Sequence, residues 1–359
     1  MKIMRLCPGT LGGHLKQFRE KNKINELNFN EQIELYRREN ILLPGSWCQE
    51  MINRGYDVFE TIYNDISLQY TWATENSNPM LYLGQEDPFF LITLDQIIQE
   101  KPDILFLYAG ACTYLSEAYI SEIRSRLDYK LIILNYWGDE LGGGLKYASQ
   151  FSDIDLIFTS CSLYSQKFQD AGLRAITLGN CFDPTILKHK DKPKIHNFTF
   201  AGVTGYGFPD HIQRYHNLCD IVKKTDLELW TNEISLKNKR YYLLTLISLF
   251  PTVPSYIYSK LNKYFSSPQI KSLLNALEIQ RITGKKRAAE SALFLSFGKN
   301  KYFLEHSLIR DLYPAKTKKP FLNASEYYEM VSQSKIVLNL HRDEEADVGN
   351  IRCFEATGL

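Results

Sequence analysis

The sequence has no uninterrupted apolar run of the roughly 20 residues that a membrane-spanning helix needs. Its first residues, MKIMRLCPG, lack the apolar core of a secretory signal peptide. These absences predict a cytoplasmic protein. The seven cysteines lie far apart and form no C-x-x-C pair, so neither a disulfide framework nor a zinc site is indicated. We expect reduced, mostly buried thiols.

An excess of charge of one sign is also missing, because 42 Lys and Arg face 41 Asp and Glu, for a net charge of +1. This balance argues against a general nucleic-acid binder, which needs many uncompensated basic residues. The motifs G-x-x-x-x-G-K-[ST], H-E-x-x-H and G-x-S-x-G do not occur, which disfavours kinases, zinc proteases and serine hydrolases. No repeat of fixed period is found, which excludes a solenoid.

The chain has 359 residues, 44% of them hydrophobic, which is enough for two domains that each have a core. In its first half, short β-rich runs alternate with helical patterns, and this rhythm predicts a parallel sheet covered by helices on both faces. After a short strand at the amino end, the expected strands are Tyr56–Ile62, Ile104–Ala109, Lys130–Tyr136, Asp155–Ser160 and Arg174–Leu178. The expected crossover helices include Leu94–Glu100, Leu115–Leu127 and Leu163–Ala171.

A polar, lysine-rich stretch, TILKHKDKPKIH, marks the expected domain boundary, with one domain at residues 1–190 and the other at 191–359. In the second domain we expect strands Phe198–Val203, Leu227–Trp230 and Ile336–Leu340, a helix from Pro209 and a helix over Ala324–Ser334. The fold class is therefore α/β, with two Rossmann-like units in tandem.

Residues 236–319 differ from both units, because sixteen Lys and Arg face only four Asp and Glu there. The run YYLLTLISLFPTVPSYIYSKLNKYF interleaves apolar and aromatic residues with lysines. Such a segment suits an anionic membrane surface. The alternative is a helical insertion with a solvated basic face, and RNA binding is a more distant one.

A glycine-rich loop, Thr204–Asp210, follows an expected strand and opens an expected helix. Gly205 lets the backbone approach a ligand, and the free N–H groups of the helix start favour a diphosphate. Arg214 lies one turn into that helix, where its charge can face the same anion. A glycine turn required only by sterics is the alternative.

The last 24 residues, IVLNLHRDEEADVGNIRCFEATGL, carry the densest group of polar residues. A buried strand leads into an acidic loop, and a new helix follows, so these groups gather at the carboxyl end of a parallel strand, where α/β sheets bind ligands. The candidate site residues are His341, Arg342, Asp347, Gly349, Asn350, Arg352 and Glu355.

Within this group, Glu355 can accept hydrogen bonds from a ribose diol, while N–H groups near Gly349 and Asn350 face a phosphate. Asp347 then faces a transferred sugar. The alternative is that Asp347 helps to cap the helix and Glu355 lies on its solvated side.

Two stretches of the first domain are candidates for a second ligand. The loop that contains Gly12 and Gly13 follows the first strand, and an ordinary turn is the alternative there. Trp137 and Asp139 offer an aromatic ring and a carboxylate that suit a hydroxyl-rich sugar, with packing of the tryptophan on the sheet as the alternative.

The chain resembles the bacterial glycosyltransferases related to the spore-maturation protein CgeB. The resemblance rests on IVLNLHRDEEADVGNIRCFEATG, LGNCFDP, FTFAGVTG, LELW and, at the amino end, LCPGTLGGHLKQF, GYDVFETIYND and QYTWATEN. It implies a GT-B fold of two Rossmann-like domains, a nucleotide-sugar donor in the C-terminal domain and an acceptor on the N-terminal side. The implied acceptor is a cell-surface polysaccharide or a lipid-linked glycan at the inner membrane face.

By the same resemblance, Asp347 and Glu355 look like the pair of acidic residues, separated by seven others, of retaining enzymes of this fold, with Asp in place of the commoner Glu. Arg214, Arg342 and Arg352 would stabilise the leaving diphosphate, so no metal and no cofactor are expected. Such an enzyme is of the hexosyltransferase type.

Two departures from the family are visible. The segment 236–319 is longer than expected, and the chain stops inside the final motif, so we expect a truncated C-terminal domain. A non-catalytic binding or scaffold protein is therefore one alternative, and an enzyme that epimerises its nucleotide sugar is another.

Overall fold

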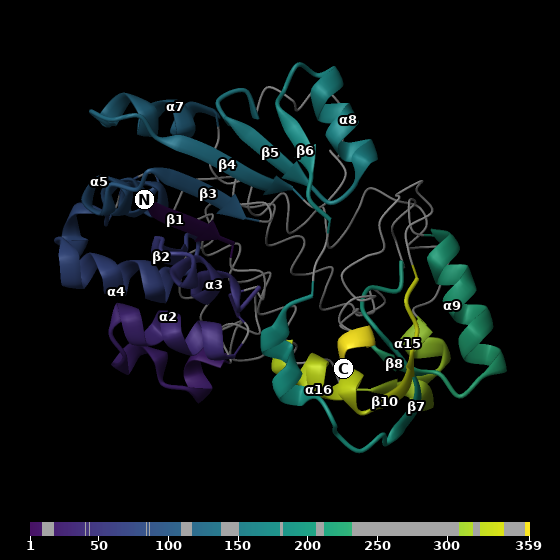
Figure 1. The fold of residues 1–359 in the computed structure, drawn as a ribbon. Helices are drawn as coiled ribbons and strands as arrows, with labels where there is room; N and C mark the ends of the chain where they lie inside the picture. Colours follow the sequence, from purple (N-terminus) through teal and green to yellow (C-terminus); the bar gives the residue numbers. More distant parts are fainter. Residues whose placement is uncertain are drawn as a thin grey trace, which may run out of the picture. The chain divides into compact units, whose positions relative to one another are not determined.

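The computed structural model describes residues 1–8, 18–39, 41–42, 44–83, 85, 87–108, 117–137, 151–179, 182–205, 212–231, 309–318, 324–340 and 356–359. The described residues form two compact α/β units (Figure 1). The first lies within residues 1–8 and 22–185, and the second within 18–21, 186–340 and 356–359. The chain passes from the first unit to the second between Thr185 and Ile186, a few residues before the expected boundary.

The first unit is built on a six-stranded, Rossmann-like sheet in which every described pair of neighbouring strands is parallel. Its strand order is β2-β1-β3-β4-β5-β6. The strands are β1 Lys2–Cys7, β2 Asp57–Ile62, β3 Ile104–Tyr108, β4 Ile132–Trp137, β5 Leu156–Thr159 and β6 Ala175–Thr177. The expected parallel sheet is confirmed, with the strand ends displaced by one or two residues.

Helices pack on both faces of this sheet, but unequally. The main core lies on one face, where Met4, Leu107 and Ile157 meet α5, α7 and α8. On the other face α3 covers the β1 to β3 side, with Trp47 stacked on Phe106 at 5.7 Å between ring centroids. The helices of this unit are α2 Phe29–Arg38, α3 Trp47–Asn53, α4 Ile66–Asn76, α5 Pro88–Glu100, α7 Glu117–Arg126 and α8 Ser162–Asp170.

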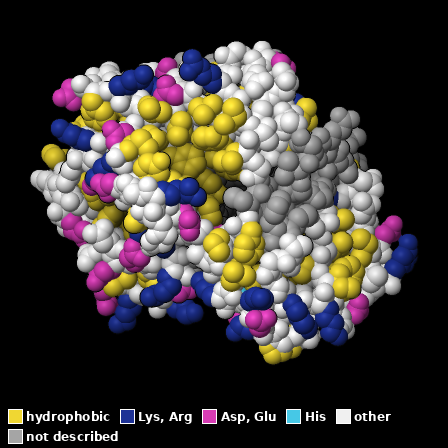
Figure 2. Space-filling view, viewed as in Figure 1, with side chains coloured by type: hydrophobic (Ala, Val, Ile, Leu, Met, Phe, Trp, Pro, Cys, Tyr) yellow, Lys and Arg dark blue, Asp and Glu magenta, His cyan; other side chains and the backbone are white. Residues whose placement is uncertain are grey.

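That second face is less well covered over β3 to β6. Phe106, Tyr136 and Phe158 are partly exposed, and Ile132 and Ile176 are 39% and 47% exposed. Apolar side chains are visible on the surface where Figure 1 draws these strands (Figure 2). The asymmetry arises because the described helices that follow β3 and β5, α7 and α8, both pack on the opposite face.

Helix starts follow local sequence chemistry. Asn28 and Glu31 form a capping box on α2, with reciprocal hydrogen bonds of 2.9 Å each. Asp65 accepts from the N–H of Leu68 to cap α4, and its other oxygen accepts from the Tyr36 hydroxyl at 2.8 Å. The cap of α4 therefore also fixes α2 against it.

A buried ion network ties β1 to β2 and α2. The Arg5 and Glu60 side chains are 0% and 1% exposed, and Arg5 Nη1 lies 3.1 Å from Glu60 Oε1. The other carboxylate oxygen of Glu60 accepts from Arg37 Nε at 2.6 Å. The Arg5 guanidinium also lies over the rings of Trp47 and Tyr108, at 4.8 and 5.0 Å from their centroids. One carboxylate thus compensates two largely buried cations.

The second unit has a four-stranded sheet of order β10-β7-β8-β9, again with parallel pairs. Its strands are β7 His196–Ala201, β8 Glu228–Trp230, β9 Thr317–Lys318 and β10 Ser334–Val337. Its helices are α9 Ile212–Lys224, α15 Ile309–Leu312 and α16 Ala324–Ser332, with the 3-10 turns η4 Pro184–His189 and η6 Pro314–Lys316. No described helix of either unit is long and apolar enough to cross a membrane.

Two expectations for this unit need correction. The strand expected at Ile336–Leu340 begins two residues earlier and ends at Val337, and the helix before it ends at Ser332 rather than Ser334. The apolar run Ile336–Leu340 does not mark the start of the strand, because β10 is an edge strand of the described sheet. An edge strand tolerates polar residues such as Ser334 and Lys335 at its start. Ser334 is held by the Thr199 hydroxyl of β7 at 2.9 Å.

Glu60→Gln should lower the free energy of unfolding by about 3 to 5 kcal/mol, since it removes the carboxylate paired with the fully buried Arg5 guanidinium, whereas Arg37 keeps its pair with Glu34. The matched control is Glu26→Ala, which removes the acid of an exposed pair with Lys23. An exposed pair contributes about 0 to 1 kcal/mol. Urea unfolding of both variants measures the difference, and equal losses would show that the buried network does not stabilise the first unit.

Candidate functional site

The carboxyl edge of the second sheet is where two sequence-predicted site stretches begin. The chain leaves β7 through α9 to reach β8 on one side, whereas β10 pairs with β7 on the other side. Adjacent parallel strands whose connections run in opposite directions create a topological switch point, which is the usual ligand position in open α/β sheets. The Gly205 loop follows β7, and the stretch leading to His341 follows β10.

Packing brings the start of α9 close to the end of the β10 stretch. Ile212, the first residue of α9, packs against the same core cluster as Leu338 and Leu340. The backbone N–H of Leu338 also donates to the carbonyl of Thr199 in β7 at 2.7 Å. Leu338 and Leu340 therefore lie against the core cluster that α9 also covers.

The residue after Glu355 is fixed on the other face of the same sheet. Ala356 packs against the cluster of Ala201, Met330 and Val331, together with Trp230. Ala201 and Trp230 are the last residues of β7 and β8. Ala356 thus packs against a cluster that includes the last residue of β7.

The loop after β7 has the geometry of a close-approach turn. Gly202 and Gly205 have φ angles of 143° and 93°, which L-residues with a side chain rarely adopt. Gly202 donates from its N–H to the Trp230 carbonyl at 3.0 Å, and Thr204 is fully buried. Arg214 is half-buried in the first turn of α9, which contains no acidic residue.

Most of the other predicted site residues lie outside the described residues. These are His341, Arg342, Asp347, Gly349, Asn350, Arg352 and Glu355 of the second unit's site and Gly12, Gly13 and Asp139 of the acceptor side. The basic aromatic run within 236–319 lies outside them as well. The roles of these residues stay predictions.

Trp137 is the described member of the predicted acceptor group. It is the last residue of β4 rather than part of a following loop, and its ring meets Phe151 edge-on at 5.4 Å between centroids. Packing on the sheet, the alternative weighed for this residue, is therefore observed. Its indole N–H is buried and makes no hydrogen bond within the described part of the chain.

Sequence patterns missed two polar residues of the first sheet, Arg5 and Asn135, which are both 0% exposed. Each interrupts an otherwise apolar strand, KIMRLC and IILNYW, and such an interruption is the signal that was available. Thr204 was included in the glycine loop but not expected to be buried.

The described cysteines offer no reactive thiol beside the Arg5 network. Burial raises the pKa of the Cys7 thiol, and its sulfur accepts from Arg5 Nε at 3.0 Å. Burial, and then the nearby Glu60 carboxylate, raises the pKa of Cys48 to about 12. Both thiols stay protonated at neutral pH, and Cys7, Cys48, Cys161 and Cys219 are free, as expected.

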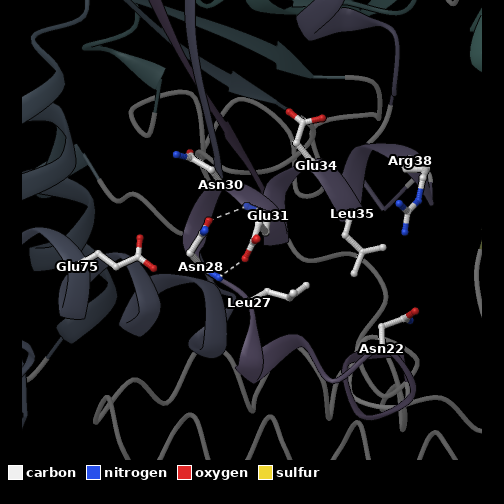
Figure 3. Close-up of a pocket in the computed structure, with 9 residues that line it drawn as sticks. All are labelled: Asn22, Leu27, Asn28, Asn30, Glu31, Glu34, Leu35, Arg38 and Glu75. Carbon is white, nitrogen blue, oxygen red and sulfur yellow. Dashed lines mark hydrogen bonds between the residues drawn. The ribbon is translucent and has the colours of Figure 1, made fainter.

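An open pocket of about 820 Å³ lies beside α2 and contains no predicted site residue (Figure 3). Its carboxylates include Glu31, Glu34 and Glu75. Glu31 belongs to the capping box, and Glu75 accepts from the N–H of Phe29 at 3.0 Å. Glu31 and Glu75 thus complete the start of α2, and Glu34 pairs with Arg37 of the same helix, so we assign no chemistry to this pocket.

Comparison with known proteins identifies no relative, since no protein-family profile and no curated protein sequence matches the chain. Within the described residues, no group of three or more His, Cys, Asp or Glu is placed to hold a metal ion. The expected metal independence remains a prediction.

Gly205→Ala should destabilise the second unit by about 1 to 2 kcal/mol, because a side chain at φ 93° meets the backbone strain of the left-handed region. Gly179→Ala is the control, since no atom lies within 4 Å of the added Cβ and Gly179 has no positive φ. Thermal unfolding compares the two. Equal melting temperatures would mean that position 205 does not need glycine.

Proposed function

We propose that this protein is a glycosyltransferase of the GT-B type that moves a sugar from a nucleotide-diphosphate donor to a glycan or lipid-linked acceptor. The observation that carries the proposal is the shared packing of Ile212, Leu338 and Leu340 beside the β7 and β10 pair. It supports the proposal because the Gly205 loop and the stretch before His341 follow two adjacent parallel strands. The resemblance of these two stretches to CgeB-like glycosyltransferases supports the same function.

Electrostatics at this edge favours a diphosphate. The helix dipole and the N–H groups of a helix start attract anions, and α9 carries Arg214 in its first turn. Gly205 leaves space for a phosphate to approach the backbone. Arg342 and Arg352 would add positive charge from the neighbouring stretch.

In the proposed reaction the bond between the sugar C1 and the diphosphate oxygen breaks, and a bond from C1 to an acceptor hydroxyl oxygen forms. The diphosphate takes the electron pair of the broken bond and accepts the proton that the acceptor hydroxyl releases as the new bond forms. Glu355 holds the ribose of the donor, and Asp347 faces the sugar. A retaining outcome and an acceptor at the inner membrane face are part of the proposal.

Arg214→Ala should weaken binding of the cognate nucleotide sugar about tenfold or more, because a charge-assisted hydrogen bond contributes about 1.5 to 3 kcal/mol. Lys223→Ala is a matched control, since Lys223 is an exposed basic residue in the last turn of the same helix. Titrations of the full chain with uridine, guanosine and thymidine diphosphate sugars, followed by thermal shift, measure the affinity. No shift with any donor, or equal loss in both variants, would contradict the proposed donor site.

Asp347→Asn and Glu355→Gln should separate binding from transfer. We expect Glu355→Gln to weaken donor binding and Asp347→Asn to retain it while losing transfer of a radiolabelled sugar to a membrane-derived acceptor fraction. Donor binding without transfer in the unaltered chain would instead support the non-catalytic alternative. A change in the sugar of the recovered nucleotide would support an epimerase.

A further inference from the structure

A group of exposed apolar side chains lies on the loop of residues 77–83, which follows α4 in the first unit. Met80, Leu81 and Leu83 are 67%, 60% and 54% exposed, although they lie within four residues of one another. Ile98 of α5 is also exposed, at 41%. Single exposed apolar side chains are ordinary on protein surfaces, whereas several together mark an interaction surface.

The structure holds this loop in a fixed conformation. Tyr82, which lies between Leu81 and Leu83, is 2% exposed, and its hydroxyl donates to the Asp95 carboxylate of α5 at 2.5 Å. The backbone N–H of Leu81 donates to the Asn78 carbonyl at 3.0 Å and closes a turn. Because a buried side chain and backbone bonds already order the loop, a partner that docks on it loses little affinity to ordering.

The part of the chain that carries this loop is acidic. Residues 55–100 contain eight Asp and Glu and no Lys, Arg or His. Asp95 contacts the loop through Tyr82, and Glu75 lies two residues before Ser77, whose hydroxyl is 3.0 Å from that of Tyr82. Neither Asp95 nor Glu75 forms an ion pair within the described part of the chain. Their negative charge therefore favours a cationic partner.

An acidic and apolar surface fits a partner that combines basic residues with apolar ones. It does not fit an anionic membrane, which attracts basic segments and repels acidic ones. The chain itself supplies the complementary chemistry, because residues 236–319 contain sixteen Lys and Arg against four Asp and Glu. Two copies of the chain can each offer the loop and the basic segment, so that two equivalent contacts form in one symmetric dimer.

We propose that the loop of residues 77–83 is a docking surface for a second copy of this chain, which binds it through the basic aromatic run at residues 241–265. Burial of Met80, Leu81 and Leu83 drives the contact. The lysines of the run compensate the charges of Glu75 and Asp95. The inference does not rest on the proposed function, because none of these residues belongs to the proposed donor site.

Sedimentation equilibrium of the full chain over a range of concentrations measures the association. Leu81→Asp combined with Leu83→Asp should weaken dimerisation about tenfold or more, because both changes remove apolar surface and add charge of the sign that the loop already carries. Ile52→Asp is the matched control, since Ile52 is a 47% exposed residue of α3 outside the loop. We expect it to leave dimerisation unchanged, as should Arg214→Ala.

A synthetic peptide of residues 255–265, SYIYSKLNKYF, tests the occupant. It should bind the unaltered chain, compete with dimerisation, and bind the double variant about tenfold or more weakly. The same peptide with Lys260→Glu and Lys263→Glu is the charge control, and we expect it not to bind, because like charges repel.

Dimerisation that the double variant and the peptide both weaken, and that Ile52→Asp does not, supports the docking surface. A chain that stays monomeric at every concentration, or a dimer that the double variant does not weaken, would overturn it. Equal binding of the two peptides would overturn it as well. Binding of lipid vesicles that needs Leu81 and Leu83, without dimerisation, would replace it with a membrane contact. Circular dichroism of each variant verifies that it is folded.

Discussion

The pairing of β10 with β7 is the constraint on which the functional account depends. The two strands are separated by more than one hundred residues of sequence, and their register places Ser334 beside His196 and Val337 beside Thr199. Because they run parallel, the segments that leave them start from the same edge. If β10 instead joined the sheet elsewhere, the segments that follow β7 and β10 would not start from adjacent strands, and the proposed donor site would lose its basis.

The first sheet has a comparable constraint at its own centre. β1 lies between β2 and β3. The Arg5 side chain of β1 contacts Glu60 of β2, Tyr108 of β3 and Trp47 of α3. A buried ion network of this kind is weak evidence of net stability, but losing one partner is costly. It therefore favours one arrangement of β1, β2 and α3 over others.

Much of the first sheet was predictable from sequence because its strands are short, buried on at least one face, and separated by helical patterns. Position and type of β2 to β6 follow from this rhythm, and α8 from Tyr164, Phe168 and Ala171 at four- and three-residue spacing. We predicted the start of β10 two residues too late because the strand begins with polar residues. An edge strand tolerates such residues, since one of its sides faces solvent. Asn135 was missed because an apolar strand pattern contains no information about hydrogen-bond partners, which depend on the neighbouring strands.

For the candidate site, the sequence predicted which kinds of side chain gather at the edge of a sheet, but not how they are arranged. The positive φ of Gly205 and the place of Arg214 in the first turn of α9 agree with the expected loop and helix. Strand order was not predictable, because the sequence between Trp230 and Ser334 gives no sign of which edge β10 joins. That order is what makes β7 and β10 adjacent, which the proposed donor site requires.

Photoaffinity labelling tests this central claim most directly. The full chain would be irradiated with photoreactive uridine and guanosine diphosphates, digested, and mapped by mass spectrometry, with excess unlabelled nucleotide as competitor. The account predicts competable labelling of both peptides, one containing residues 202–214 and the other residues 341–355. Labelling confined to the first unit, or to only one of these peptides, would contradict a shared donor site beside β7 and β10.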